Sequence, residues 1–300
     1  MATLHNNVVP ASGATPLNYG SRGVFGGGYA GAPTHTVSKY SYKTIASSAN
    51  TSNFGDMVSG TYEIFGFSGG GRGVYGGGSS DSIEYVTIAS TGNGTDFGNL
   101  TISNNGQSGA SDGTRGLIIG GNDKSIIDYI TIASTGNAAS FGNMSEYWPF
   151  GSSLADTIRA VTIHNDNIDY LTIASTGNGT DFGTLSLPAK RGTGCANATR
   201  GVFDNGETAA NGHNNGTLAY VTIQTTGNAS SFGNLNQALE GRASASDGTY
   251  GIFVAGRDDD NVPLGYVNTI DKINIASTGN ATDWGDFSYT PYMHAGASGD

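Results

Sequence analysis

Five arginines occupy the same position in successive copies of a repeated sequence, and they form the most regular set of side chains that could bind a ligand. They are Arg22, Arg72, Arg115, Arg159 and Arg200, and Tyr250 takes this position in the sixth copy. Asp112, Asp156 and Asp247 stand three residues before it in three copies. A ring of guanidinium groups would attract anions or carboxylated sugars. Contacts to carboxylates or carbonyls would instead join neighbouring repeats, and a fixed position in a repeat favours this packing role.

Polar loop residues are the other candidates for binding. Asp258, Asp259 and Asp260 could supply oxygen ligands to Ca²⁺ together with Asn261, although acidic loop tips are usually just solvated, and a second variable loop contains His213 and Asn214. The five histidines show no i, i+2 or i+4 pairing, which a metal site on one element would need. We therefore predict no metal, no cofactor and no catalytic residues, and the binding residues stay open between these loops and the arginines.

Two short motifs match known signatures but lack their context. Residues 26–31 fit the dinucleotide-binding pattern G-x-G-x-x-G, yet no helix start follows to hold a phosphate. Asp96-Phe97-Gly98 spells the metal-loop tripeptide of kinases, but it belongs to the repeat and no catalytic-loop motif accompanies it. The single cysteine, Cys195, cannot form an internal disulfide and is predicted to be a small buried residue. The sequence therefore predicts that the protein is not an enzyme.

The elements that position these residues follow from the repeat itself. Each copy contains a strand-like phrase, Thr-Ile-Ala-Ser in four copies and a variant of it in the other two, and nine residues after its isoleucine comes an aromatic-Gly pair. The copies lie 43, 44, 41, 50 and 52 residues apart, a period typical of solenoids, propellers and repeat arrays. The isoleucines are Ile45, Ile88, Ile132, Ile173, Ile223 and Ile275, and the aromatic residues are Phe54, Phe97, Phe141, Phe182, Phe232 and Trp284.

Composition and strand pattern select a propeller among these folds. The chain has 49 Gly and only 12% charged residues, which indicates short strands and tight turns. Four predicted strands per copy, with apolar residues on both faces of the third, describe a six-bladed, all-β propeller of four-stranded blades. The phrase at 295–300 repeats a first strand, while residues 19–22 begin a second strand. One blade is therefore predicted to be shared by the two termini, which would close the ring.

Two resemblances add to this interpretation. The runs Arg22 to Gly28 and Arg72 to Gly78 end in glycines and resemble the kelch propeller repeat, although the glycines are lost in the fourth and fifth copies. The phrases Arg-Gly-Val-Phe-Gly-Gly-Gly and Thr-Ile-Ala-Ser-Thr-Gly-Asn-x-x-Asp-Phe-Gly are similar to repeats in structural proteins of tailed phages of marine bacteria, including cyanophages. That resemblance implies a virion component of the tail, neck or fibre.

We therefore expect a non-enzymatic phage virion protein in a tail, fibre or neck appendage, with contacts to the host surface. The alternatives are a glycan-binding, lectin-like module and a head decoration protein. Residues 1–18 are expected to form a docking arm onto other virion proteins, and residues 19–300 the propeller, in multiple copies per particle. A net charge of −11 with thirteen Lys and Arg argues against nucleic acid. No signal peptide or membrane span is predicted, so we expect synthesis in the host cytoplasm.

Overall fold

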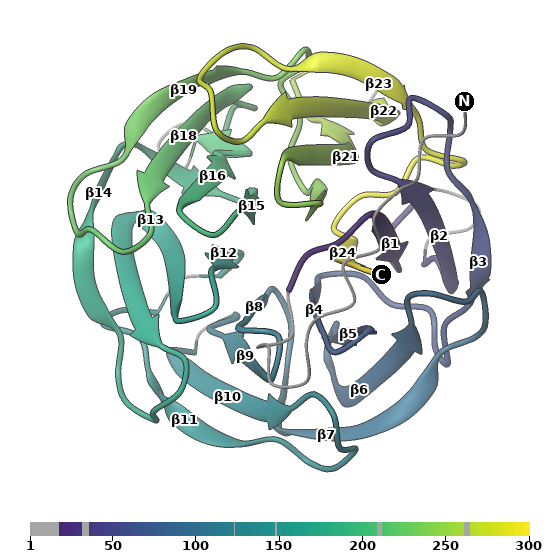
Figure 1. The fold of residues 1–300 in the computed structure, drawn as a ribbon, viewed down its shortest axis with the longest axis vertical. Helices are drawn as coiled ribbons and strands as arrows, with labels where there is room; N and C mark the ends of the chain where they lie inside the picture. Colours follow the sequence, from purple (N-terminus) through teal and green to yellow (C-terminus); the bar gives the residue numbers. More distant parts are fainter. Residues whose placement is uncertain (1–17, 32–35, 123, 148, 209–211, 261–264) are drawn as a thin grey trace, which may run out of the picture.

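The chain forms six four-stranded antiparallel sheets arranged as blades around a central axis (Figure 1). This computed structural model describes residues 18–31, 36–122, 124–147, 149–208, 212–260 and 265–300. The predicted fold class, an all-β six-bladed propeller, is confirmed. Of the expected docking arm, residues 1–17 lie outside the described residues, and only Asn18 can be placed.

The first three blades contain the following strands, in order from the axis outward. Blade I consists of β24 (Ala295–Gly299), β1 (Arg22–Gly26), β2 (Lys39–Thr44) and β3 (Ser52–Asp56). Blade II consists of β4 (Ile64–Gly69), β5 (Arg72–Gly77), β6 (Ser80–Thr87) and β7 (Thr95–Asn104). Blade III consists of β8 (Ser108–Ser111), β9 (Arg115–Ile119), β10 (Ile126–Thr131) and β11 (Ala139–Asn143).

The last three blades follow the same order. Blade IV consists of β12 (Ser152–Ala155), β13 (Arg159–Thr172) and β14 (Thr180–Lys190), with β17 (Glu207–Thr208) at its edge. Blade V consists of β15 (Thr193–Ala196), β16 (Arg200–Asp204), β18 (Thr217–Thr222) and β19 (Ser230–Asn234). Blade VI consists of β20 (Ala243–Ser246), β21 (Tyr250–Asp258), β22 (Gly265–Asn274) and β23 (Thr282–Asp286).

Blade IV reaches the same architecture with one long strand. The first half of β13 pairs with β12 and its second half pairs with β14. The Ile173 N–H donates to the Ile158 carbonyl oxygen at 3.0 Å, so the two ends of β13 lie together and the strand turns back on itself. It therefore supplies both the second and the third strand of this blade.

The two termini close the ring in blade I, as predicted. β24, the last strand of the chain, pairs antiparallel with β1, the first, from Arg22 opposite Gly299 to Gly26 opposite Ala295. The C-terminus therefore lies at the axis beside β1 (Figure 1). This pairing leaves blade I with the same four strands as the other blades, so no blade is left incomplete.

The core lies between the blades. Six apolar clusters each combine residues of two neighbouring blades, and together they occupy all six interfaces. In β10, Ile127 packs toward blade IV and Ile130 toward blade II. This confirms the expectation that both faces of the third strand are apolar, because each sheet is covered on both sides.

Strand direction divides the molecule into two faces. The connections from the second to the third strand, and from the fourth strand to the next blade, lie on one face, which we call the upper face. The connections from the first to the second and from the third to the fourth strand lie on the opposite, lower face. All the variable loops recognised in the sequence therefore belong to the upper face.

Candidate functional site

The five repeated arginines join neighbouring blades on the lower face. Each donates from Nη1 to the carbonyl oxygen of the repeat isoleucine in the next blade, at 2.8 to 3.3 Å. The pairs are Arg22 with Ile88, Arg72 with Ile132, Arg115 with Ile173, Arg159 with Ile223 and Arg200 with Ile275. In the sixth interface the Trp284 indole N–H donates to the Ile45 carbonyl oxygen at 2.8 Å. The partners are thus backbone carbonyls, and an additional role in binding anions stays untested.

Each of these cations also lies over an aromatic ring of its own blade. The guanidinium carbon lies 4.0 to 4.7 Å from the ring centroid of the tyrosine on the third strand, which adds a cation–π attraction. Blade VI exchanges the two residue types, because Tyr250 stands at the arginine position and Lys272 at the tyrosine position. The Lys272 ammonium lies 4.5 Å from the Tyr250 ring centroid and 3.0 Å from that of Trp284.

The aspartates three residues before the arginines serve the turn rather than the guanidinium. Asp112 Oδ1 accepts the backbone N–H of Arg115 at 2.7 Å, and Asp156 and Asp247 accept the corresponding N–H groups at 2.8 and 2.6 Å. The carboxylate alternative for the arginine contacts is therefore wrong. A short acidic side chain at this position caps the turn that connects the first two strands.

The Thr-Gly-Asn turn and the Phe-Gly pair form a second contact between blades. The asparagine side chain of each turn accepts a backbone N–H from the fourth strand of the preceding blade, at 2.9 to 3.1 Å in all six interfaces. The asparagines are Asn50, Asn93, Asn137, Asn178, Asn228 and Asn280. A Cβ on Gly142 would overlap the Gly177 carbonyl oxygen, so the close approach of the turn requires glycine after the aromatic residue. The most repeated phrases in the chain are thus structural.

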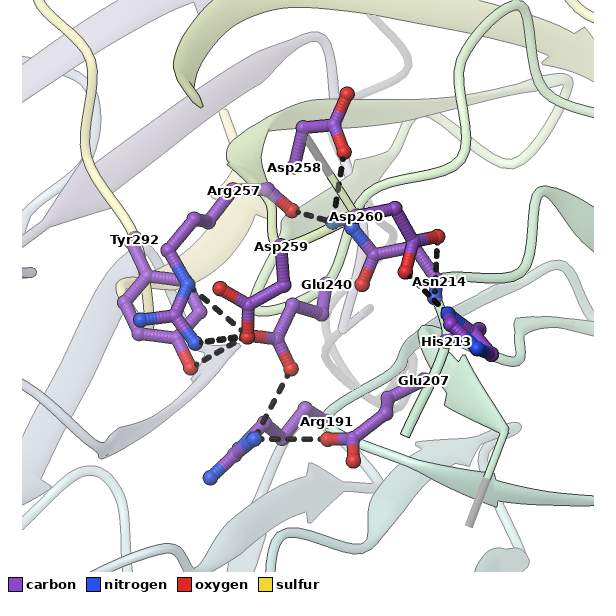
Figure 2. Close-up of polar contacts among 10 residues, drawn as sticks. All are labelled: Arg191, Glu207, His213, Asn214, Glu240, Arg257, Asp258, Asp259, Asp260 and Tyr292. Atoms are coloured by element: carbon purple, nitrogen blue, oxygen red, sulfur yellow. Dashed lines mark hydrogen bonds and ion pairs between the residues drawn. The ribbon is translucent and has the colours of Figure 1, made fainter. Parts of the chain in front are cut away.

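The upper face carries residues that are not repeated. Glu240, whose side chain is fully buried, receives hydrogen bonds from Arg191 at 3.1 Å and from the Tyr292 hydroxyl at 3.0 Å (Figure 2). Arg257 also donates to it, from Nε at 3.1 Å. Arg191 donates in addition to Glu207 at 2.7 Å. Segments from blades V and VI and the connection into blade I therefore meet in one ionic network.

The two glutamates of this network have different proton affinities. Burial acts to raise the pKa of Glu240, but the charges of Arg191 and Arg257 outweigh it and hold this pKa below its ordinary value. Burial and the hydrogen bond to Glu240 raise the pKa of Glu207. Glu240 is therefore the more acidic of the two glutamates.

The loop residues singled out in the sequence border this network (Figure 2). His213 Nδ1 lies 2.6 Å from Asp260 Oδ1, and the Asn214 N–H donates to Asp260 Oδ2 at 3.1 Å. Asp259 accepts a hydrogen bond from Arg257 at 2.6 Å, and Asp258 accepts the Asp260 N–H at 3.1 Å. The structure thus brings the two predicted loops together. In the described part of the chain, no three His, Cys, Asp or Glu side chains form a group that could hold a metal ion.

A closed ring of backbone hydrogen bonds surrounds the axis on the upper face. In each blade, a residue one or two positions before the innermost strand donates its N–H to the carbonyl oxygen of its counterpart in the preceding blade, at 2.8 to 3.0 Å. In blade order these residues are Met293, Glu63, Gly106, Phe150, Arg191 and Gly241. We call this ring the mouth. It opens into an axial channel lined by the innermost strands.

The lower end of the channel is covered by Asn18. Its side-chain nitrogen donates to the backbone carbonyl oxygens of Ser111 at 2.6 Å and Ala155 at 3.1 Å. Its backbone carbonyl oxygen accepts a hydrogen bond from the Ser68 hydroxyl at 3.0 Å. The chain thus crosses the axis at this point before it enters β1.

A buried ionic triad joins blades V and VI. Arg242 Nε lies 3.8 Å from Asp204 Oδ2, and Arg242 Nη1 lies 3.6 Å from Asp271 Oδ2. All three side chains are almost fully buried. Burial raises the pKa of Asp204 to about 7 and outweighs the charge of Arg242, which acts to lower it. With a proton on Asp204, the triad has no net charge.

Sequence reasoning missed the mouth and both ionic groups. Their residues come from different repeats and share no residue type, so a search for repeated side chains passes over them. One signal was available, because each mouth residue stands just ahead of an innermost strand. Charged residues that occur in one copy only, such as Asp204 and Arg242, were a second signal.

None of the described residues forms a helix long and apolar enough to cross a membrane. No protein-family model matches the chain, and no curated protein matches it. Among solved structures, the one described as "Structure of YjhT" superposes with a TM-score of 0.66 at 8% sequence identity, over 79% of this chain and 87% of that chain. At this identity the likeness shows the fold alone, a six-bladed, kelch-like β-propeller.

Proposed function

We propose that the chain is a non-enzymatic structural protein of a phage virion, located in a tail, fibre or neck appendage. The observation that carries this proposal is the division between the two faces. The repeated phrases hold the blades together, while the upper face presents residues found once each. These same phrases resemble repeats of phage structural proteins. A rigid ring with one unique face suits a component that attaches to a particle and displays a contact surface.

The partners we propose are other virion proteins, bound through residues 1–18, and a receptor or glycan on the host surface. We also propose that the protein is located in the virion and that each particle contains several copies of it. Nucleic acid and membrane insertion are not part of it, since the chain carries 24 acidic residues against 13 basic ones.

Purified particles provide the test. Mass spectrometry should find the protein at a fixed stoichiometry, and a difference map between normal particles and particles that lack it should place density on the tail, fibre or neck. A chain without residues 1–17 should fold with an unchanged melting temperature but be missing from particles. Absence of the full-length protein from purified particles would reject the proposal, and a copy number matching the capsid lattice would make it a head decoration protein.

A glycan-binding module is the second candidate, and the aromatic residues of the upper face favour it. Tyr62, Tyr29, Tyr266 and Tyr292 form a row with successive ring centroids 5.8, 5.9 and 6.4 Å apart. Tyr62 is 39% exposed. Aromatic rings beside carboxylates and arginines offer both the apolar surface and the hydrogen-bonding groups that sugars require.

A further inference from the structure

Four of the six mouth residues carry side chains on a backbone that favours glycine. The φ angles are 59° for Glu63, 63° for Phe150, 57° for Arg191 and 53° for Met293, and glycines with φ of 69° and 62° take the other two positions. A left-handed backbone costs a non-glycine residue about 1 kcal/mol or more. Glycine would avoid this cost at all six positions. Two of the side chains have structural contacts, because Arg191 belongs to the ionic network and Met293 is buried. Glu63 and Phe150 remain partly exposed, and strained positions of this kind are typical of binding sites.

The four residues occupy two pairs of positions across the axis. In a six-membered ring, residues three blades apart lie across the axis, so Glu63 of blade II faces Arg191 of blade V. Phe150 of blade IV likewise faces Met293 of blade I. The mouth therefore combines a carboxylate opposite a guanidinium with an aromatic ring opposite a thioether.

Arg191 keeps hydrogen-bonding capacity toward this mouth. Its Nη1 serves both Glu207 and Glu240, while its Nε has no hydrogen-bond partner among the described residues. Figure 2 shows its second terminal nitrogen pointing away from both glutamates, with no contact drawn. The guanidinium carbon lies 5.0 Å from the Phe150 ring centroid, so the cation and the aromatic ring border the same space.

Glu63 supplies the acceptor on the other side. It is partly exposed and accepts a hydrogen bond from the Asn105 side chain. Burial raises the pKa of Glu63, whereas Asn105 and the charge of Arg191 act to lower it. The charges of Glu63 and Arg191 therefore interact, and the two residues contribute opposite charges to the mouth.

We propose that the mouth binds one neutral sugar unit, such as the terminal residue of an uncharged glycan. A hydroxyl group can donate to Glu63 and accept from Arg191, and the C–H face of a sugar ring can pack against Phe150. The pocket at the mouth is open to solvent, and its lining includes Glu63, Phe150 and Arg191. A molecule with a net charge would be repelled by one of the two ionic groups and attracted by the other, so it would gain little from its charge while it loses the hydration of that charge. This inference rests on the glycan-binding candidate and gives that candidate its site.

The test uses the full chain and saturation-transfer NMR with methyl glycosides of glucose, galactose, mannose and N-acetylglucosamine, with sialic acid as a charged comparison. At least one neutral glycoside should bind, and sialic acid should bind at least tenfold more weakly. Glu63→Gly removes the carboxylate and relieves the backbone, so it should weaken binding at least tenfold while the melting temperature stays the same or rises. Ser79→Gly is the matched control, because Ser79 has a φ of 67° outside the mouth; it should leave binding unchanged.

No binding by any neutral glycoside would overturn the inference, as would unchanged binding by Glu63→Gly or stronger binding of sialic acid. Failure of this test leaves the virion location untouched, since particle composition is measured separately. Conversely, absence of the protein from purified particles would not contradict a sugar-binding site at the mouth.

Discussion

Asp204 is the residue whose protonation should be most strongly coupled to folding. Its pKa is about 7 in the folded protein because of burial, against about 3.9 in an unfolded chain. A raised pKa means that the folded state binds a proton which the unfolded state has lost. This contribution to stability is complete below about pH 4 and disappears as the pH rises through 7.

Replacing Asp204 with Asn should remove that pH dependence. The amide oxygen can still accept the Gly206 N–H, a bond of 3.0 Å in the wild type. We expect the stability of the variant relative to the wild type to rise between pH 5 and pH 8, by about 1.4 kcal/mol for each pH unit until the pH passes the folded-state pKa of about 7. Urea unfolding at both pH values measures this. Equal differences at pH 5 and pH 8 would show that Asp204 does not titrate in this range.

Arg115 tests whether the lower-face arginines hold blades or bind anions. Replacing it with Lys removes the planar guanidinium that both stacks on Tyr129 and reaches the Ile173 carbonyl. The expected loss is about 1 kcal/mol, the size of one such hydrogen bond, seen as a lower melting temperature. Added sulfate should not stabilise the wild type more than an equal ionic strength of chloride does. Selective stabilisation by sulfate, with an unchanged melting temperature in the variant, would support an anion site instead.

The contact between the Thr-Gly-Asn turn and the fourth strand of the preceding blade contains two glycines, and replacing each of them with alanine tests whether close approach requires glycine. Gly142 has no room for a Cβ beside the Gly177 carbonyl, whereas a Cβ on Gly177 would meet nothing within 4 Å. Gly142→Ala should therefore destabilise the protein by about 1–3 kcal/mol, as overpacking does, and Gly177→Ala by much less. Thermal unfolding of the two variants measures the difference. Similar losses would mean that backbone flexibility, rather than close approach, selects glycine at these positions.

The elements were predictable to the extent that each repeat encodes them. The isoleucine and aromatic-Gly spacing placed the strands of every blade, and the matching fragments at the two ends predicted the pairing of β24 with β1. The arginine position was also visible, but not its partner, because a carbonyl oxygen has no sequence signature. In blade VI, Lys272 replaces the tyrosine of the third strand and Tyr250 replaces the arginine. This exchange could not be interpreted from the sequence, because the sequence does not show that the two side chains touch.

The candidate site was less predictable, for a physical reason. A mouth residue such as Phe150 is defined by its backbone angle and by its counterparts in two other blades, and neither is written in its own repeat. The loops with His213 and Asp260 were recognised as variable, yet their contact depends on ring closure. A site at the axis of a propeller is formed by residues from several blades, so no single repeat contains the information that would predict it.

Closure of the ring should therefore govern the stability of the whole molecule. Deleting residues 295–300 removes β24, which exposes the edge of β1 and opens the core between blades I and II, where Ala295 and Ala297 are buried. The expected cost is several kcal/mol, a large part of the roughly 5–15 kcal/mol that stabilises a domain. The bare β1 edge should also pair with other chains, giving self-association that grows with concentration. Calorimetry and analytical ultracentrifugation measure these effects. A truncated chain that melts like the wild type and remains monomeric would show that the other five interfaces hold the propeller without closure, and sugar binding at the mouth should then persist as well.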